Sequence, residues 1–234
     1  MSFEQERNFA ESLAETPSVL RYSDILKVGT PIADMNYHTL IPSNGGSFSA
    51  NQMIRIPFNI PTDSFANLKG AYIKFTINNA DASNIVALDP IIGGAAVIDT
   101  FRIVSGTGSL LEEIIPYNAI YSLMNDMVSV GHRESNGNVM EGSAETPLTE
   151  LALGGTGAND VASDPTTNPR TLIAAGGSKT ITHTPMSGFF QCDRLAPLGF
   201  ATGTSTIEIV LAQAQFPLTF NNDATSPNTA WTIS

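Results

Sequence analysis

The chain has 234 residues, and 11 Lys and Arg stand against 22 Asp and Glu, so its net charge at pH 7 is −11. Charged residues are 14% and hydrophobic residues 42% of the sequence, which argues against disorder over most of its length and predicts one domain with appendages. The acidic balance argues against direct nucleic-acid binding, because phosphate binding depends on clusters of Lys and Arg. The single cysteine cannot form an internal disulfide. No apolar run reaches the ~18 residues that span a bilayer, and the first residues lack the layout of a signal peptide.

The beginning of the chain has a short helical pattern. Over residues 1–16, Phe3, Phe9 and Leu13 fall near one face, and acidic residues occupy the rest. Pro17 ends this pattern, and the sequence then has no regular period up to residue 49. We therefore expect residues 1–49 to be an N-terminal arm, made of a short helix and an irregular tether.

From residue 51 the hydrophobic period changes to two. Ile54, Ile56 and Phe58 alternate with polar or less apolar positions, which predicts a strand with one buried face. Pro57 lacks a backbone donor, so this strand is expected at a sheet edge or beside a bulge. The same reasoning predicts further strands over residues 71–78, 101–105, 110–115, 178–184, 206–211, 216–220 and 229–233, with a Gly-bearing turn over 106–109.

One helix, over residues 118–130, interrupts the strands, with Pro116 before it and Gly131 after it. Its apolar residues form two stripes, and a helix that is apolar on two faces must be covered on two faces. The first stripe is Tyr117, Tyr121, Met124 and Val128, and the second is Ile120, Leu123, Met127 and Val130.

A long stretch rich in Gly, Asn, Ser, Thr and Pro, residues 131–177, follows the helix and is expected to be an exterior loop. The pattern as a whole predicts an all-β, jelly-roll (Greek-key) sandwich with one inserted helix and an extended N-terminal arm. The sandwich is expected over residues 50–220. Residues 221–234 are expected to be a linker, or the start of a further strand or of a second jelly roll.

Candidate catalytic and metal-binding residues are sparse. His38, His132 and His183 lack metal-ligand spacing, and we expect three surface or loop histidines and no metal site. Cys192 follows two phenylalanines and is expected to be a packed thiol. Glu112 and Glu113 are adjacent on a strand and point to opposite faces, so they cannot form an acid pair. The sequence thus predicts neither a cofactor nor an enzyme activity.

Seven motifs, given in chain order at the end of this paragraph, resemble the N-terminal jelly roll of the double jelly-roll major capsid proteins of virophages and polinton-like viruses. The resemblance covers residues 50–212. It implies a capsid protein of a DNA virus, located in the virion, which forms trimeric capsomers and an icosahedral shell with copies of itself and with other capsid proteins. The motifs are Met53–Pro61, Leu68–Phe75, Ile98–Ile103, Ser105–Gly108, Leu111–Ile114 with Tyr117–Asn118, Phe189–Gly199 and Thr206–Leu211.

The chain departs from this family because only residues 221–234 remain for a second sandwich. One alternative is a single jelly-roll vertex or minor capsid protein. Another is a carbohydrate-binding β-sandwich module, although Trp231 is the only tryptophan and the 131–177 loop has no aromatic residue. Within the capsid hypothesis, Phe3, Phe9 and Leu13 are the expected inter-subunit contacts. The acidic arm favours a shell that an internal membrane or basic proteins separate from the genome.

Overall fold

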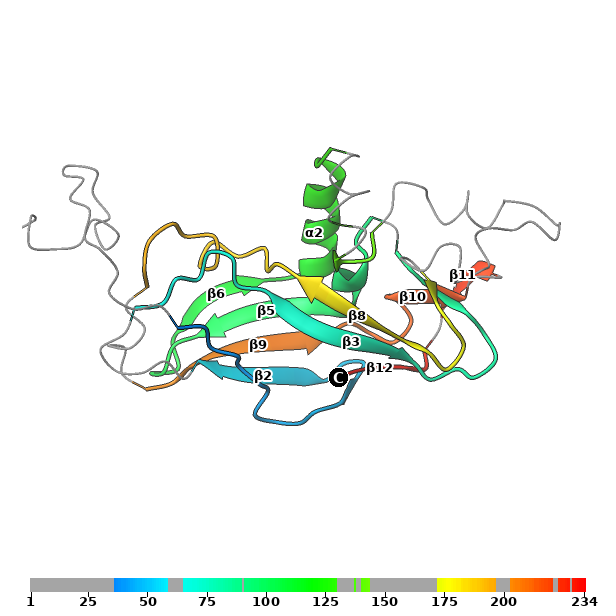
Figure 1. The fold of residues 1–234 in the computed structure, drawn as a ribbon, viewed down its shortest axis with the longest axis horizontal. Helices are drawn as coiled ribbons and strands as arrows, with labels where there is room; N and C mark the ends of the chain where they lie inside the picture. Colours follow the sequence, from blue (N-terminus) through cyan, green and yellow to red (C-terminus); the bar gives the residue numbers. More distant parts are fainter. Residues whose placement is uncertain are drawn as a thin grey trace, which may run out of the picture.

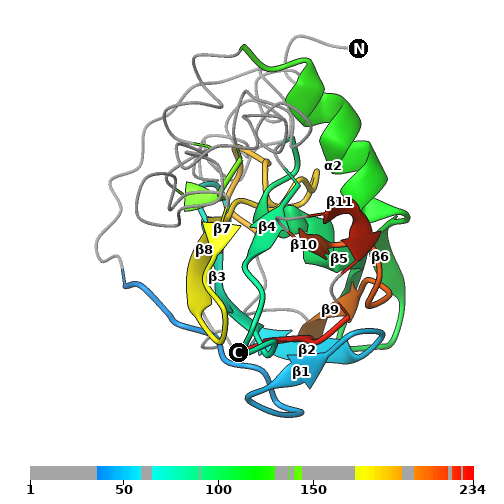
Figure 2. The same ribbon diagram turned by 90° about the vertical axis from the view of Figure 1, so that its right-hand side faces the viewer.

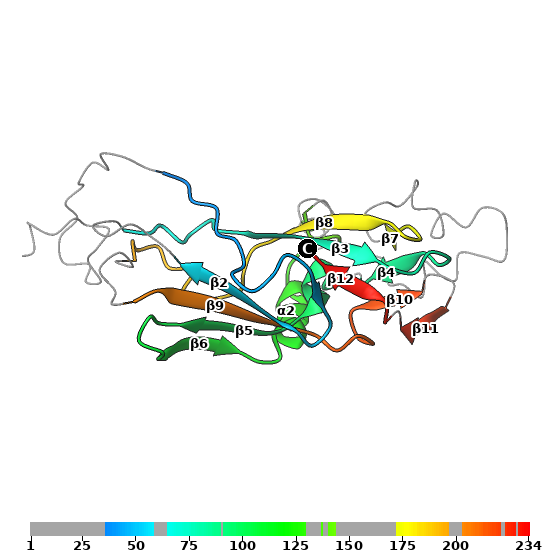
Figure 3. The ribbon, with the colours of Figure 1, turned by 90° about the horizontal axis from the view of Figure 1, so that it is seen from below.

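A computed structural model of the chain describes residues 36–58, 65–89, 91–129, 137, 140–143, 172–196, 203–220, 223–227 and 229–234. Two four-stranded antiparallel sheets face each other as the layers of a sandwich, and a third, smaller sheet lies at one end (Figures 1 and 3). The expected helix over residues 1–16, with Phe3, Phe9 and Leu13, lies outside the described residues. So does most of the expected 131–177 loop.

The first sheet has the order β2 (Met53–Phe58), β9 (Ser205–Leu211), β5 (Ile98–Val104) and β6 (Leu110–Ile114). Its strands alternate as predicted, since the apolar residues of β2 and β9 at every second position are buried in the sandwich. β2 lies at the edge of this sheet, which confirms the position that Pro57 indicates. Residues of this sheet in the core are Ile54, Ile56, Phe58, Ile98, Phe101, Ile103, Ile207, Ile209 and Leu211.

The second sheet has the order β1 (Phe48–Ser49), β12 (Trp231–Ile233), β3 (Ile73–Asn79) and β8 (Ser178–His183). The end of the described chain thus adds a strand to the sandwich, and Phe48, before residue 50, is part of its core. The third sheet consists of β11 (Asp223–Pro227), β10 (Leu218–Phe220), β4 (Val86–Leu88) and β7 (Leu172–Ile173). The sequence pattern did not predict β4 or the short 3-10 helix η2 (Gly94–Val97), and both are fully buried.

The connections between the two large sheets follow the jelly-roll pattern. The chain passes from the first sheet to the second between β2 and β3, contributes β5 and β6 to the first sheet, and crosses again from the second to the first between β8 and β9. Since β2 pairs with β9 and β3 pairs with β8, both antiparallel, one two-stranded ribbon folds across both layers. This nested pairing, with α2 (Tyr117–Asp126) inserted after β6, confirms the all-β jelly-roll class that the sequence predicts.

The outer faces of both large sheets are polar. Across the first sheet, Arg55, Glu208, Arg102 and Glu113 stand side by side on four neighbouring strands, so that positive and negative charges alternate. Arg55 Nε lies 3.1 Å from Glu208 Oε1, and Arg102 pairs with Glu113. On the outer face of the second sheet, the hydroxyls of Thr76 and Thr180 lie 3.2 Å apart. The polar groups at the centre of these faces therefore pair with one another.

Candidate assembly surface

The helix α2 exposes its aliphatic side chains and turns its aromatic and polar side chains toward the sandwich. Figure 1 shows α2 standing upright from the sandwich, at a steep angle to the strands, and Figure 2 shows it on the outside of the molecule. Its buried residues are Tyr117 and Asn125. The helix ends at Asp126, four residues before the predicted end. An ordinary surface helix has the opposite arrangement, with its apolar stripe against the core.

The exposed side of α2 and of the turn after it is mostly apolar, and Asp126 and Ser129 are its exposed polar residues. Leu123 is 62% and Met127 is 78% exposed. Together with Ile120, Met124 and Val128, which are also exposed, they leave an apolar area on the order of 500 Å², within the range of about 300–600 Å² for the largest patch on a typical monomer, which often marks an interaction site. We call these five residues the α2 face. The stripe Ile120, Leu123 and Met127 is uncovered, so the second covering that the sequence pattern demands is absent from the described residues.

Four side chains hold the base of α2 to the sandwich, and we call them the anchor network: Tyr117, Tyr121, Glu141 and His183. His183, on β8, is fully buried. Its Nε2 lies 2.6 Å from the hydroxyl of Tyr117, and its Nδ1 lies 2.9 Å from Oε1 of Glu141. The hydroxyl of Tyr121 donates to Oε2 of Glu141 over 2.5 Å. The two tyrosine rings stack one turn apart on the helix, and both meet the imidazole edge-on.

One assignment of protons satisfies every polar atom of the anchor network. The backbone N–H of Met186 donates to the Tyr117 oxygen over 2.9 Å, so the hydroxyl of Tyr117 donates in turn to Nε2 of His183. The imidazole then carries its hydrogen on Nδ1 and donates it to the ionised carboxylate of Glu141. A fully satisfied buried network of this kind fixes the orientation of the elements that it joins.

The order Tyr117, His183, Glu141 is that of a nucleophile, a base and an orienting carboxylate. An activated nucleophile needs a lowered pKa and access to substrate. Burial instead raises the pKa of Tyr117, and the negative charges of Glu141 and Glu112 add to this effect. The Tyr117 side chain is also fully buried. The arrangement therefore joins α2 to β8 and is not equipped to react.

The carboxylate of Glu141 is kept ionised in spite of its burial. Burial alone would raise the pKa of Glu141, but the hydrogen bonds from the imidazole of His183 and from the hydroxyl of Tyr121 lower it below its ordinary value of 4.5. The backbone of the same residue is held as well, since its carbonyl accepts the N–H of Gly94 in η2 over 2.7 Å. At the other end of the helix, Asn125 donates to the carbonyl of Ile91.

We expect acid to destabilise the protein through Glu141. A carboxyl group with a lowered folded-state pKa contributes stability above its unfolded-state pKa, and this contribution is lost as the pH falls through the folded-state value. Urea unfolding at several pH values should therefore show a loss of stability below about pH 4.5. The Glu141→Gln variant, which cannot ionise, should be less stable at pH 7 and should lose less stability on acidification. An equal loss in both proteins would contradict this assignment.

The prediction that all three histidines are surface or loop residues is wrong for His183. The burial pattern of β8 places Ile181 and His183 on the inner face, where an unpaired imidazole would be costly. Because His183 lies two residues after the apolar Ile181, the strand period could have indicated that His183 is buried. Nothing in the sequence identified Glu141 or the two tyrosines as the partners of His183. The prediction for Glu112 and Glu113 is confirmed. Glu113 pairs with Arg102, and Glu112 accepts hydrogen bonds from residues 187–189.

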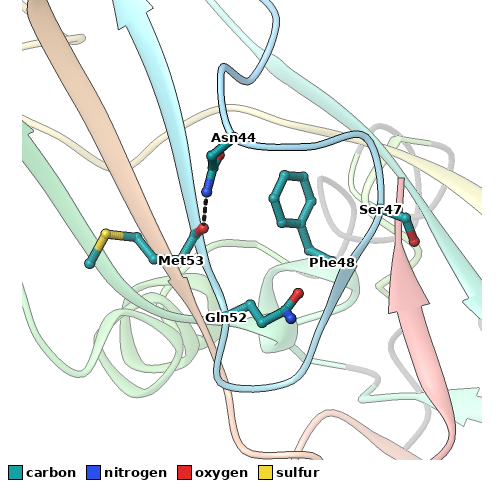
Figure 4. A pocket seen from close by; sticks show the side chains of 5 residues that line it. All are labelled: Asn44, Ser47, Phe48, Gln52 and Met53. Carbon is teal, nitrogen blue, oxygen red and sulfur yellow. Dashed lines mark hydrogen bonds between the residues drawn. The ribbon is translucent and has the colours of Figure 1, made fainter.

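A hollow of about 340 Å³ lies beside the β1–β2 connection, but its polar and aromatic side chains already contact the protein and are not available to bind a sugar. Figure 4 shows Asn44 reaching toward Met53, whose carbonyl accepts its amide hydrogen over 2.6 Å. Oδ1 of Asn44 accepts the N–H of Arg55, so the amide covers the open edge of β2. Phe48, the aromatic residue of the hollow, is 6% exposed and offers no stacking platform.

The described residues also give no support to sugar stacking by Trp231, to a reactive thiol at Cys192 or to a metal site. The ring of Trp231 is 2% exposed, and its Nε1 donates to the carbonyl of Ala214 over 2.9 Å, so it cannot stack on a sugar. Cys192 is half-buried. Within the described part of the chain no cluster of His, Cys, Asp and Glu could hold a metal ion. No helix there is long and apolar enough to cross a membrane.

Comparison with known proteins yields matches among solved structures. No family model matches the chain, and no curated protein matches it. The crystal structure of PBCV-1 VP54, fitted into a reconstruction of the virophage Sputnik, is 12% identical with a TM-score of 0.32. The PBCV-1 virus capsid is 13% identical with a TM-score of 0.32. Each match covers 87% of this chain and 43% of the other, so the chain spans less than half of the capsid chains it matches.

Proposed function

We propose that the chain is a structural subunit of a viral capsid and that it assembles with copies of itself. The observation that carries this proposal is the combination of a jelly-roll sandwich with a rigidly anchored helix whose apolar face is exposed. Exposure of an apolar face to water is unfavourable in free energy, and burial of the face against a neighbouring subunit removes that penalty. Most of the motifs that resemble capsid proteins overlap β2, β3, β5, β6 and β9 of the sandwich, whereas Phe189–Gly199 lies between strands.

The finer features of the assembly follow from the sequence resemblance. We propose trimeric capsomers in an icosahedral shell, a location in the virion, and contacts with other capsid proteins. A vertex or minor capsid role remains the second form of the same proposal. The net charge of −11 favours a shell that does not touch its genome directly. A structural role of this kind requires neither a catalytic centre nor a cofactor.

Sedimentation velocity of the purified full chain over a range of concentrations tests the proposal. We expect species larger than the 24.8 kDa monomer to grow with concentration. A glycan array run on the same sample tests the alternative of a carbohydrate-binding module. A protein that stays monomeric at high concentration and binds glycans would contradict the capsid proposal, and assembly without glycan binding would support it.

The N-terminal arm is proposed to bind neighbouring subunits through Phe3, Phe9 and Leu13. Each apolar anchor would contribute about 1.5–3 kcal/mol before the cost of ordering the arm, and closed symmetry repeats that contact in every copy. Deletion of residues 1–16 should leave the melting temperature of the sandwich nearly unchanged and should reduce the assembled fraction in light scattering. Normal assembly of the shortened chain would remove the arm from the proposal.

A further inference from the structure

We infer that the α2 face is a contact between two copies of this chain, in which α2 of one copy packs antiparallel against α2 of the other across a two-fold axis. This inference rests on the proposed function and specifies one of its interfaces. It is carried by the exposed side chains of α2, by their lack of charge and by the way the helix is fixed to the sandwich.

The helix presents its apolar face in a fixed orientation. Tyr117 and Tyr121 bind one side of it to His183 and Glu141, and Asn125 binds its other end to the carbonyl of Ile91. Tyr117, Tyr121 and Asn125 thus bind the sandwich. Leu123 and Met127 are exposed, as is the charged Asp126. A preorganised face loses little conformational entropy when it binds, which favours a specific contact over a loose one.

The charge pattern favours a second copy as the occupant. Between Arg102 and the end of the helix there is no Lys or Arg. The five residues of the α2 face carry no charge, and the one charged residue of the helix, the exposed Asp126, lies beside them. Two copies with a net charge of −11 repel each other over most of their surface, and an uncharged face is where they can approach. An isologous contact brings a surface patch against itself, so a patch without charge is self-complementary.

The size of the face also fits a contact between two copies. An area on the order of 500 Å² on each copy buries a total of about 1,000 Å², which is the lower limit for a specific interface. At the centre of the two sheets the outer faces carry paired polar groups. The exposed Leu110 and Leu111 of the first sheet lie on its edge strand β6. Met124 and Met127 are flexible and adapt to the facing side chains.

The register of this contact is set by the extent of the α2 face. The face runs from Ile120 to Val128, so its centre lies at Leu123 and Met124. In an antiparallel pair that is centred on the face, Leu123 lies near Leu123 of the second copy, close to the two-fold axis.

Substitution of Leu123 in the full chain tests the contact. Leu123→Asp should weaken self-association about 30-fold or more in sedimentation equilibrium, as for a central interface residue. Tyr72→Asp is the matched control, because Tyr72 is 64% exposed, much as Leu123 is, but lies outside the α2 face, and it should change the constant less than threefold. Both variants should melt within a few degrees of the wild type, because both side chains are exposed.

Disulfide cross-linking tests the geometry separately. In a Cys192→Ser background, which removes the native thiol, Leu123→Cys should give a disulfide-linked dimer on mild oxidation, and Tyr72→Cys should not. Assembly of Leu123→Asp at the wild-type concentration would overturn the inference and leave the proposed function intact. So would an assembled Leu123→Cys sample that forms no cross-link. A wild-type chain that never associates would overturn both.

Discussion

Replacement of His183 by alanine is expected to lower the free energy of unfolding by about 3–5 kcal/mol. The substitution removes the group between the Tyr117 hydroxyl and the Glu141 carboxylate, and it leaves both buried without their partner. For a domain of this size the melting temperature should fall by roughly 10 °C. Thermal unfolding followed by circular dichroism measures the change.

Two further variants separate the anchor network from ordinary polar contacts. Tyr117→Phe removes only the hydroxyl, so it should cost about 1–3 kcal/mol and leave the contact between His183 and Glu141 in place. Glu113→Gln breaks the half-exposed pair with Arg102 and should cost less than about 1 kcal/mol. If the His183 and Glu113 variants lose equal stability, the anchor network does not hold the helix as described.

Replacement of Gly93 by alanine should lower the free energy of unfolding about as much as His183→Ala, because a side chain at this position collides with the backbone. Gly93 has a φ of 61°, and a Cβ there would lie 2.3 Å from the carbonyl oxygen of Glu141 and 2.9 Å from the backbone nitrogen of Ser143. Both neighbours are backbone atoms, so they cannot rotate away. The segment that carries Glu141 must move, and the anchor network is disturbed with it. We expect a loss of about 3 kcal/mol or more in urea unfolding.

Gly108 provides the matched control for this substitution. It also has a positive φ, of 85°, but a Cβ there meets no atom within 4 Å. Gly108→Ala therefore reports the backbone strain alone and should cost about 1 kcal/mol. Equal losses at the two glycines would mean that the close approach of Gly93 to Glu141 is unimportant.

Strands β2, β3, β8 and β9 of the sandwich were predictable because each has one buried face. The short β1 lies in the stretch that was expected to be irregular. In β2 the alternation of Ile54, Ile56 and Phe58 identifies the buried face directly. The buried strand β4 and helix η2 lack this alternation, since all of their residues are buried, and they could not be distinguished by period. The nested pairing of strands depends on contacts between segments far apart in the chain, which local patterns do not record.

The candidate surface was only half predictable. The two apolar stripes of the helix indicate that both sides must be covered, but they do not say which side faces the sandwich. Tyr117 and Tyr121 turn inward because their hydroxyls reach His183 and Glu141. Met124 and Val128, of the same stripe, are exposed. That choice depends on a loop residue that the sequence gives no reason to associate with the helix. It leaves Leu123 and Met127 on the outside.

Electron cryomicroscopy of the purified full chain under assembly conditions tests the capsid account most directly. We expect closed particles whose walls are built from the sandwich, with paired helices of the α2 type in the contacts between subunits. Isolated sandwiches at every concentration, in a sample that is folded by circular dichroism, would contradict the account.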